Sequence, residues 1–289
     1  ITEMEHHSNI VPWQMMVEER GAKLIVVPFF DTGELDMEAF KKLLSNKTKI
    51  VACAHVSNTL GTINPIHEII RLAHEKGAKV LVDGAQSAPH MPLDVQEMGC
   101  DFFVFSGHKV VGPTGVGVLY GKKELLDQMP PFEGGGDMIE TVTFAKTTYN
   151  TVPLKFEAGT PMIAEVVGLG AALDFLMSIG MKKIDQYEQE LLAYFFPKLE
   201  AIAGVQILGK AKKRSGNLTF IVKGVHPLDI ATLLDLRGIA IRSGHLCAQP
   251  VMCHYGCTAA ARASLSFYNT KEDVDRFLEA LTEILPLLC

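Results

Sequence analysis

Short apolar runs alternate with helical patterns through the first 120 residues, and this alternation restricts the chain to a small group of folds. The runs are rich in branched and aromatic residues, as buried strands are. Between them, residues 36–44 and 65–76 place apolar side chains at helical spacing. Strands separated by helices predict an α/β fold with a parallel or mixed sheet and helices on both faces. The predicted strands are residues 23–27, 50–56, 79–83, 102–106 and 116–120.

Polar side chains follow two of these runs. Asp83 ends one run, Ser106 ends the next, and Lys109 comes shortly afterwards. Open α/β sheets bind ligands at the carboxyl ends of their strands, so we expect Asp83 and Lys109 to face one ligand. A lysine and an acid that converge on one small molecule indicate pyridoxal phosphate. A lysine holds this cofactor as a Schiff base, and an acid contacts its pyridinium nitrogen.

The second half of the chain has a different pattern. Residues 129–160 are rich in Gly, Pro and Thr, and a loop of that length is usually functional. We expect a large cofactor-binding α/β domain over residues 1–163, and a connecting helix with a small α+β domain over residues 164–289. Its predicted helices are 164–178, 183–202, 227–236 and a last one capped by Thr270, and its predicted strands are 218–222 and 239–242.

The first ten residues read as the end of a strand that runs into a helix, and they contain no initiator methionine. A sheet that starts here would need strands from upstream. We therefore expect the chain to be a fragment of a longer polypeptide.

Composition excludes several classes of protein. The net charge is −6 with scattered Lys and Arg, which gives no reason to expect nucleic acid as a partner. No apolar segment reaches the roughly 18 residues that span a bilayer, and no signal peptide is present. We expect no membrane association, and a location in the cytoplasm or an organelle interior. The six cysteines do not form a disulfide scaffold, and the spacing of Cys247, Cys253 and Cys257 matches no usual zinc motif, so no metal is predicted.

Eight motifs occur in order along the chain and carry a close family resemblance. Together they resemble the fold-type I pyridoxal-phosphate enzymes of the class V aminotransferase superfamily. The SufS-type group II cysteine desulfurases, which include selenocysteine lyases, are most similar. The motifs are Glu5-His6-His7-Ser8-Asn9-Ile10-Val11-Pro12-Trp13, His55-Val56-Ser57-Asn58, Val82-Asp83-Gly84-Ala85-Gln86, Ser106-Gly107-His108-Lys109, Glu133-Gly134-Gly135-Gly136, Phe156-Glu157-Ala158-Gly159-Thr160-Pro161, Arg242-Ser243-Gly244-His245-Leu246-Cys247-Ala248 and Arg262-Ala263-Ser264-Leu265.

The resemblance implies a role for each cofactor-binding position. Lys109 would anchor pyridoxal phosphate covalently and move the substrate α-proton, and Asp83 would pair with the pyridinium nitrogen. His6 would stack on the cofactor ring, although His7 is a competing candidate. The resemblance also implies a homodimer. Further cofactor contacts are implied for Gln86 and Asn58 near the phenolic oxygen, Ser106 and His108 at the phosphate, and Thr160, with Gly134 and Gly135, at the neighbouring subunit's phosphate site.

In the family, the presence of a cysteine at the position of Cys247 distinguishes enzymes that remove sulfur from enzymes that transfer an amino group. In the family its thiolate takes the substrate sulfur, leaves alanine, and passes the persulfide to a SufE-like or SufU-like acceptor for iron–sulfur cluster assembly. His245 and Arg242 would help to form the thiolate. Arg262 would bind the substrate carboxylate, with Asn58 and Arg242 nearby.

Two features depart from the family pattern. His245-Leu246 stands where many relatives have two histidines, and the upstream Gly-Thr-Thr phosphate loop is absent from this sequence. Three alternatives stay open at this stage. They are a selenocysteine lyase, another class V aminotransferase or lyase, and a noncatalytic fragment or interaction subunit.

Overall fold

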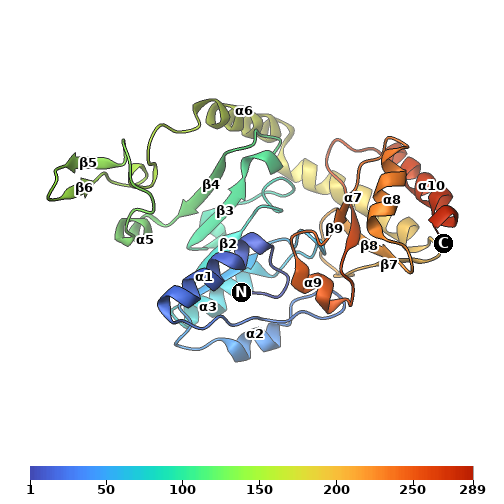
Figure 1. Cartoon of the computed structure of the whole chain (residues 1–289), viewed down its shortest axis with the longest axis horizontal. Helices are drawn as coiled ribbons and strands as arrows, with labels where there is room; N and C mark the ends of the chain where they lie inside the picture. The colour runs from blue at the N-terminus through green and yellow to red at the C-terminus, as the bar shows by residue number, and fades with distance from the viewer. Residues whose placement is uncertain (289) are drawn as a thin grey trace.

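The computed structural model describes residues 1–288, and its first half is built on a mixed four-stranded sheet. The strands β1 (Ile50–Ala54), β2 (Lys79–Asp83), β3 (Phe102–Ser106) and β4 (Gly117–Gly121) lie in that order. The first three are parallel, and β4 is antiparallel to β3 (Figure 1). The last residue of β2, Asp83, lies between Ala54 and Val104 in the register. The carboxyl ends of β1, β2 and β3 therefore meet at one edge.

Five helices accompany this sheet, and two of them match their sequence predictions closely. Asp36 caps α2 by accepting from Ala39 N at 2.8 Å. The helix α3 buries four apolar residues on one face, which is the stripe that the sequence places there. The helices are α1 (Val11–Arg20), α2 (Met37–Leu43), α3 (Ile66–Glu75), α4 (Val95–Met98) and α5 (Lys123–Gln128).

The second half of the chain forms an antiparallel sheet with its own apolar core. Its strand order is β7 (Val205–Ile207), β8 (Asn217–Val222), β10 (Ala260–Ser264) and β9 (Arg242–Gly244). The Thr270 hydroxyl accepts from Asp273 N at 3.2 Å and starts the last helix, as predicted. The helices are α6 (Ile163–Ile179), α7 (Met181–Glu200), α8 (Pro227–Asp235), α9 (Gln249–His254) and α10 (Lys271–Leu288), of which α7, α8 and α10 pack on the core of this sheet.

The segment after β1 joins the two sheets. The Thr219 hydroxyl of β8 donates to Thr59 O at 2.5 Å, and Arg214 Nη2 donates to Leu60 O at 3.3 Å. Apolar residues from 246 to 260 also pack into the core of the first sheet. The C-terminal half thus contributes directly to the edge where Asp83 lies. The boundary between residues 163 and 164 stays a prediction.

Three sequence predictions need correction. The 129–160 loop contains the hairpin of β5 (Ile139–Val142) and β6 (Thr147–Tyr149), which projects at one end of the molecule (Figure 1). Residues 23–27 form no strand and make a single bridge, Thr2 to Val27, because only the short segment 1–3 pairs with them in the described residues. The predicted strand at 239–242 begins only at Arg242, because Ile239 and Ile241 pack against the core instead of pairing.

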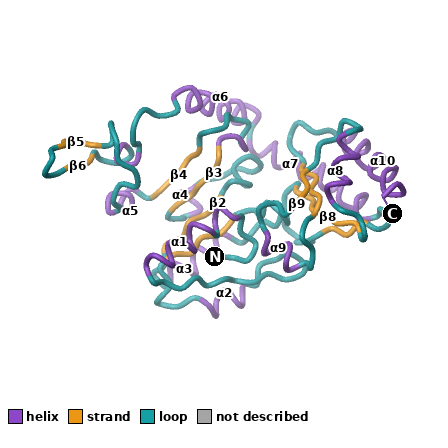
Figure 2. Tube along the Cα trace, viewed as in Figure 1, coloured by secondary structure: helices purple, strands orange, loops and turns teal. Residues whose placement is uncertain are grey.

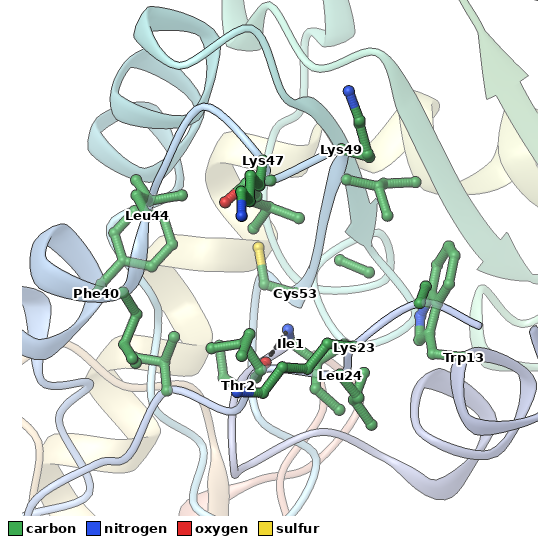
Figure 3. Close-up of a pocket in the computed structure, with 18 of the residues that line it drawn as sticks. Ile1, Thr2, Trp13, Lys23, Leu24, Phe40, Leu44, Lys47, Lys49 and Cys53 are labelled. Atoms are coloured by element: carbon green, nitrogen blue, oxygen red, sulfur yellow. Dashed lines mark hydrogen bonds between the residues drawn. The ribbon is translucent and has the colours of Figure 1, made fainter. Parts of the chain in front are cut away.

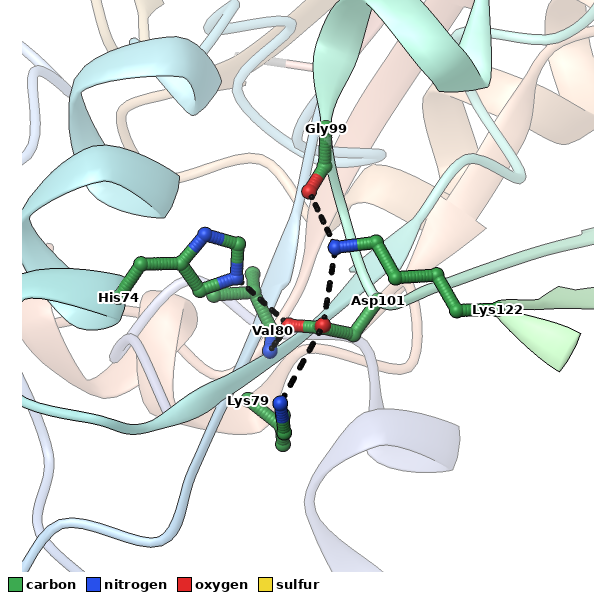
Figure 4. A network of polar contacts seen from close by, with 6 residues as sticks. All are labelled: His74, Lys79, Val80, Gly99, Asp101 and Lys122. Carbon is green, nitrogen blue, oxygen red and sulfur yellow. Dashed lines mark hydrogen bonds and ion pairs between the residues drawn. The ribbon is translucent and has the colours of Figure 1, made fainter. Parts of the chain in front are cut away.

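A buried carboxylate fixes the opposite edge of the first sheet. Asp101, just before β3, is 1% exposed. Its Oδ2 accepts from Val80 N at 2.8 Å and contacts His74 Nε2 at 2.7 Å, while Lys122 Nζ donates to Oδ1 at 3.1 Å (Figure 4). These contacts hold the starts of β2 and β3 and the end of the antiparallel β4 together.

No single helix among the described residues has the length and apolar character to cross a membrane. Taken together, α6 and α7 have the length and apolar composition of a membrane span, but the pair is bent by 72° at the break between the two helices. The chain trace shows that bend beside β3 and β4 (Figure 2).

Candidate active site

Asp83 and Lys109 occupy adjacent strand ends, as the sequence predicts. Asp83 closes β2, and Lys109 closes the 3-10 turn η2 (Gly107–Lys109) that directly follows β3. A Cβ at Gly107 would lie 2.8 Å from a Val116 methyl carbon, so only glycine fits this turn. Burial lowers the pKa of the Lys109 amine, the charges of Asp83 and Cys247 oppose that shift, and Arg262 adds to it. Four of the predicted site residues therefore lie within electrostatic reach of one another.

Close packing explains why a glycine follows Asp83. A Cβ on Gly84 would lie 1.9 Å from Cζ of Phe103, so no side chain fits there. Gly84 has no left-handed backbone angle, so close packing and not backbone strain requires the glycine. Asp83 Oδ1 accepts from Ala85 N at 2.9 Å, which orients the carboxylate and leaves Oδ2 to point elsewhere.

Gln86 is oriented by a residue of the other sheet. Its Oε1 accepts from Asn217 Nδ2 at 3.0 Å, at the start of β8. The amide nitrogen of Gln86 is therefore the atom available to donate to a ligand.

His6 and His7 lie in different surroundings. The half-buried His6 precedes the turn η1 (His7–Asn9), and its Nδ1 accepts from Ser8 N at 3.1 Å. Burial lowers the pKa of His6, Lys109 lowers it further, and Asp83 raises it. His7 instead contacts the Cys247 segment through a hydrogen bond from its backbone N–H to Cys247 O at 2.8 Å. Of the two candidates, His6 is the one on the side of Lys109 and Asp83.

A buried glutamate holds this histidine turn in place. Glu5 is 0% exposed, and its Oε2 accepts from Asn9 Nδ2 at 2.7 Å and from Ala54 N at 2.9 Å. Since Ala54 is the last residue of β1, Glu5 ties the turn to the sheet edge where Asp83 ends β2.

Cys247 lies on a constrained turn between β9 and α9. Both Leu246 and Cys247 have left-handed backbone, with φ of 54° and 52°. Such angles are unfavourable for side chains other than glycine and persist only where the surroundings fix them. Asn58 Nδ2 supplies one such contact by donating to Leu246 O at 2.8 Å. The hydrogen bond from His7 N to Cys247 O supplies another.

Arg262 and Arg242 lie opposite each other on β10 and β9. Arg262 Nη1 donates to Asn58 O at 2.8 Å, and its Nε donates to Ser264 Oγ at 3.0 Å. Burial lowers the pKa of Arg262, and the neighbouring charge of Arg242 adds to this shift. These contacts fix the guanidinium plane, and Arg242 is exposed beside it.

Among residues 1–288, the side chains of Ser106, His108 and Thr160 make no polar contact with this group. Ser106 is half-buried at the end of β3, and His108 is exposed beside Lys109. Thr160 is exposed in the segment before α6. Ser106 and His108 are close to Lys109 along the chain, whereas Thr160 lies 51 residues after it.

Sequence reasoning missed two residues of this group. Asn217 orients Gln86 from a strand that carries no motif, so no sequence signal indicated it. His7 was considered only as a substitute for His6. Its position within the Glu5–Trp13 motif was the available signal, but its link to Cys247 joins residues far apart in the chain.

A cavity among the described residues lies elsewhere. It has a volume of about 490 Å³ and is lined by residues of α1, α2, β1 and the 22–27 segment (Figure 3). No predicted site residue lines this cavity, although Cys53 does. This cavity therefore does not mark the predicted site.

Comparison with known proteins identifies the family. The family model described as "Aminotransferase class-V" matches residues 1–277 of this chain. The chain belongs to the aminotransferase class-V family. A probable cysteine desulfurase of Halalkalibacterium halodurans is 54% identical over 97% of this chain and 69% of its own length. A cysteine desulfurase of Salmonella agona is 50% identical over 100% of this chain and 71% of its own length.

Solved structures of this class V family share the fold. The crystal structure of the cysteine desulfurase CsdA from Escherichia coli matches with a TM-score of 0.96 and 40% sequence identity. The match covers 100% of this chain and 72% of that one. The chain thus has the class V aminotransferase fold, which confirms the fold class expected from the sequence.

Proposed function

We propose that this class V chain is a cysteine desulfurase that converts L-cysteine to L-alanine and collects the sulfur as a persulfide on Cys247. Relatives at about half sequence identity carry that name. The observation that carries the proposal is the position of Cys247. It is held by Asn58 and His7 on a constrained turn, and its charge acts on Lys109.

The residues at the sheet edge fit pyridoxal phosphate as the cofactor. Lys109 is an amine whose pKa is lowered by burial, which favours Schiff-base formation. Asp83 keeps Oδ2 for a pyridinium N–H, and Gln86 keeps an amide N–H for a phenolic oxygen. Ser106, His108 and the stacking face of His6 complete the set that we assign to the cofactor. When bound, pyridoxal phosphate withdraws electrons from the substrate α-carbon.

Lys109 and Arg262 act on the substrate amino acid. The Arg262 guanidinium, oriented by Asn58 O and Ser264 Oγ, binds the α-carboxylate. Lys109 takes the proton from Cα and returns a proton later, and burial, which lowers the pKa of Lys109, favours the neutral amine that the first step needs.

Cys247 performs the sulfur transfer. Its thiolate forms an S–S bond with the substrate sulfur while the substrate C–S bond breaks. The electron pair of the broken bond stays on the substrate carbon, which takes a proton and leaves as part of alanine. The second sulfur remains on Cys247 as a persulfide, which a thiol of an acceptor protein removes.

The finer assignments are also proposals. The short stretch between Arg242 and Ala248 favours the group II, SufS-type subclass, with a SufE-like or SufU-like acceptor. The exposed apolar residues Ile163, Val166 and Val167 on α6 support a homodimer. In such a dimer, Thr160 would reach the neighbouring subunit's phosphate site.

The test compares the chain with Cys247→Ala in the presence of pyridoxal phosphate and L-cysteine. The proposal expects alanine formation to fall at least about 100-fold. Alanine production that continues undiminished would favour another class V lyase. Steady-state rates with cysteine and selenocysteine separate the desulfurase from a selenocysteine lyase, because both reactions use the same residues.

A further inference from the structure

His7 contacts the chain at Cys247 and just beyond it. Its backbone N–H donates to Cys247 O at 2.8 Å, and its ring Nε2 accepts from Gln249 N at 3.1 Å. Gln249 is the first residue of α9. One residue of the N-terminal turn therefore fixes the backbone at the nucleophile and two residues beyond it.

These contacts also fix the proton positions on two imidazole rings. Because His7 Nε2 accepts a hydrogen bond, the proton of the neutral ring lies on Nδ1. In His245 the roles of the two ring nitrogens are reversed. Its Nδ1 accepts from Cys247 N at 3.0 Å, so the proton of the neutral ring lies on Nε2. Each ring thus keeps one N–H to donate.

Both rings lie close to the Cys247 sulfur. A ring nitrogen of His7, a ring nitrogen of His245 and Cys247 Sγ lie within 4.8 Å of one another. The two ring centroids are 5.4 Å apart. These residue types also bind zinc, but the backbone N–H groups of Cys247 and Gln249 already use one lone pair on each ring. After these contacts each neutral ring has one N–H left that can act as a donor near an anionic sulfur.

The charges around the sulfur come from several elements. Lys109 in η2, Arg262 on β10 and Arg242 on β9 are the cationic groups on this side of the site. Burial lowers the pKa of His7, and His245 lowers it further, so the His7 imidazole is neutral near pH 7. A neutral N–H donor stabilises an anion without adding a charge that Arg262 would repel.

We propose that His7 is a positioning residue for the Cys247 sulfur, which fixes the backbone around the nucleophile and donates its ring N–H to the thiolate and then to the persulfide. The persulfide part rests on the function proposed above, whereas the thiolate part does not. Removal of the imidazole should leave substrate binding by Arg262 intact and slow the reactions of Cys247.

The experiment measures alkylation of Cys247 by iodoacetamide in the pyridoxal-phosphate-loaded protein, without substrate, by peptide mass spectrometry. Exposed Cys253 in the same chain is the internal reference. The loss variants are His7→Leu and His7→Asn. The leucine side chain has no acceptor, and the asparagine side chain is too short to reach Gln249 N. His7→Gln places an amide oxygen near the Nε2 position. Exposed His67→Leu on α3 is the matched control.

The loss variants should alkylate Cys247 about tenfold more slowly at pH 7, with the midpoint of the pH profile about one unit higher. His7→Gln, which restores the acceptor for Gln249 N but not the Nδ1–H donor, should fall between the parent and His7→Leu, and Cys253 should react equally in all variants. With cysteine as substrate, kcat should fall while KM stays unchanged. Unchanged pH profiles for Cys247 in both loss variants would overturn the proposal. Equal changes in the alkylation rates of Cys247 and Cys253 would also overturn it. Because alkylation needs no turnover, a failed desulfurase assay would not affect this readout.

Discussion

Arg262 donates a hydrogen bond from Nη1 to the backbone carbonyl of Asn58 across 2.8 Å, and the Asn58 amide donates to Leu246 O over the same distance. Asn58 therefore joins the arginine that we assign to the substrate carboxylate to the residue before the nucleophile. It comes from the segment after β1, whereas Arg262 and Leu246 belong to the C-terminal half. Asn58 is therefore one of the residues through which the two halves of the chain meet at the site.

Arg262→Lys should raise KM for cysteine by about tenfold or more, because lysine cannot grip a carboxylate with two parallel hydrogen bonds. The value of kcat should change less than KM. Steady-state kinetics over a range of cysteine concentrations measures both. Exposed Arg276→Lys on α10 is the control. An unaltered KM in the Arg262 variant would remove this residue from the substrate site.

Lys109→Ala should abolish the visible absorbance band of the lysine-linked cofactor and reduce kcat at least about 100-fold, since both the anchor and the proton carrier are lost. Absorbance spectra and alanine assays check the two effects separately. Lys182→Ala, at an exposed position of α7, should behave as the parent chain does. A band that survives in the Lys109 variant would show that another amine holds the cofactor.

Asp101→Asn should lower the free energy of unfolding by about 2 to 3 kcal/mol, because it weakens a buried network without affecting the opposite sheet edge. Although burial raises its pKa, the hydrogen bonds from His74, Val80 and Lys122 outweigh this, and the pKa of Asp101 is lowered. Its stabilising contribution is therefore present above the ordinary carboxyl pKa and is lost as pH falls through the folded pKa. Urea unfolding at several pH values tests this.

The exposed Lys123–Asp127 pair provides the comparison for that measurement. Asp127→Asn should change the free energy of unfolding by less than about 0.5 kcal/mol. Equal effects of the two substitutions would contradict a special role for the Asp101 network.

The strand ends could be predicted because β2 and β3 are apolar runs that stop at polar residues, and Asp83 and Lys109 follow from that pattern. Strand β7 could not be predicted from the sequence, because its three residues are too few to show an alternating apolar pattern. Residues 23–27 have the composition of a strand, but pairing depends on a neighbour that local sequence does not specify. Likewise, the contact of His7 with Cys247 joins residues 240 positions apart, so motif order alone could not reveal it.

Glu5 should make stability depend on pH near neutrality. Burial raises its pKa to about 7, against the opposing hydrogen bonds from Thr2, Asn9 and Ala54 N. The folded state therefore binds this proton more tightly than the unfolded chain. Its favourable contribution is full below the ordinary carboxyl pKa, falls as pH rises from about 4.5 to about 7, and is lost above that.

Glu5→Gln should remove this dependence. The free energy of unfolding of the parent relative to Glu5→Gln should fall by about 3 kcal/mol between pH 4.5 and pH 8. Exposed Glu124→Gln serves as the control. Parallel pH profiles for the parent and Glu5→Gln would show that Glu5 does not titrate in this range.

The most direct test of the account is the mass of the Cys247 peptide after one addition of L-cysteine to the pyridoxal-phosphate-loaded chain, with no sulfur acceptor present. The account predicts one additional sulfur atom on Cys247, none on Cys253, and one alanine released for each persulfide formed. Alanine released while the Cys247 peptide keeps its original mass would contradict it.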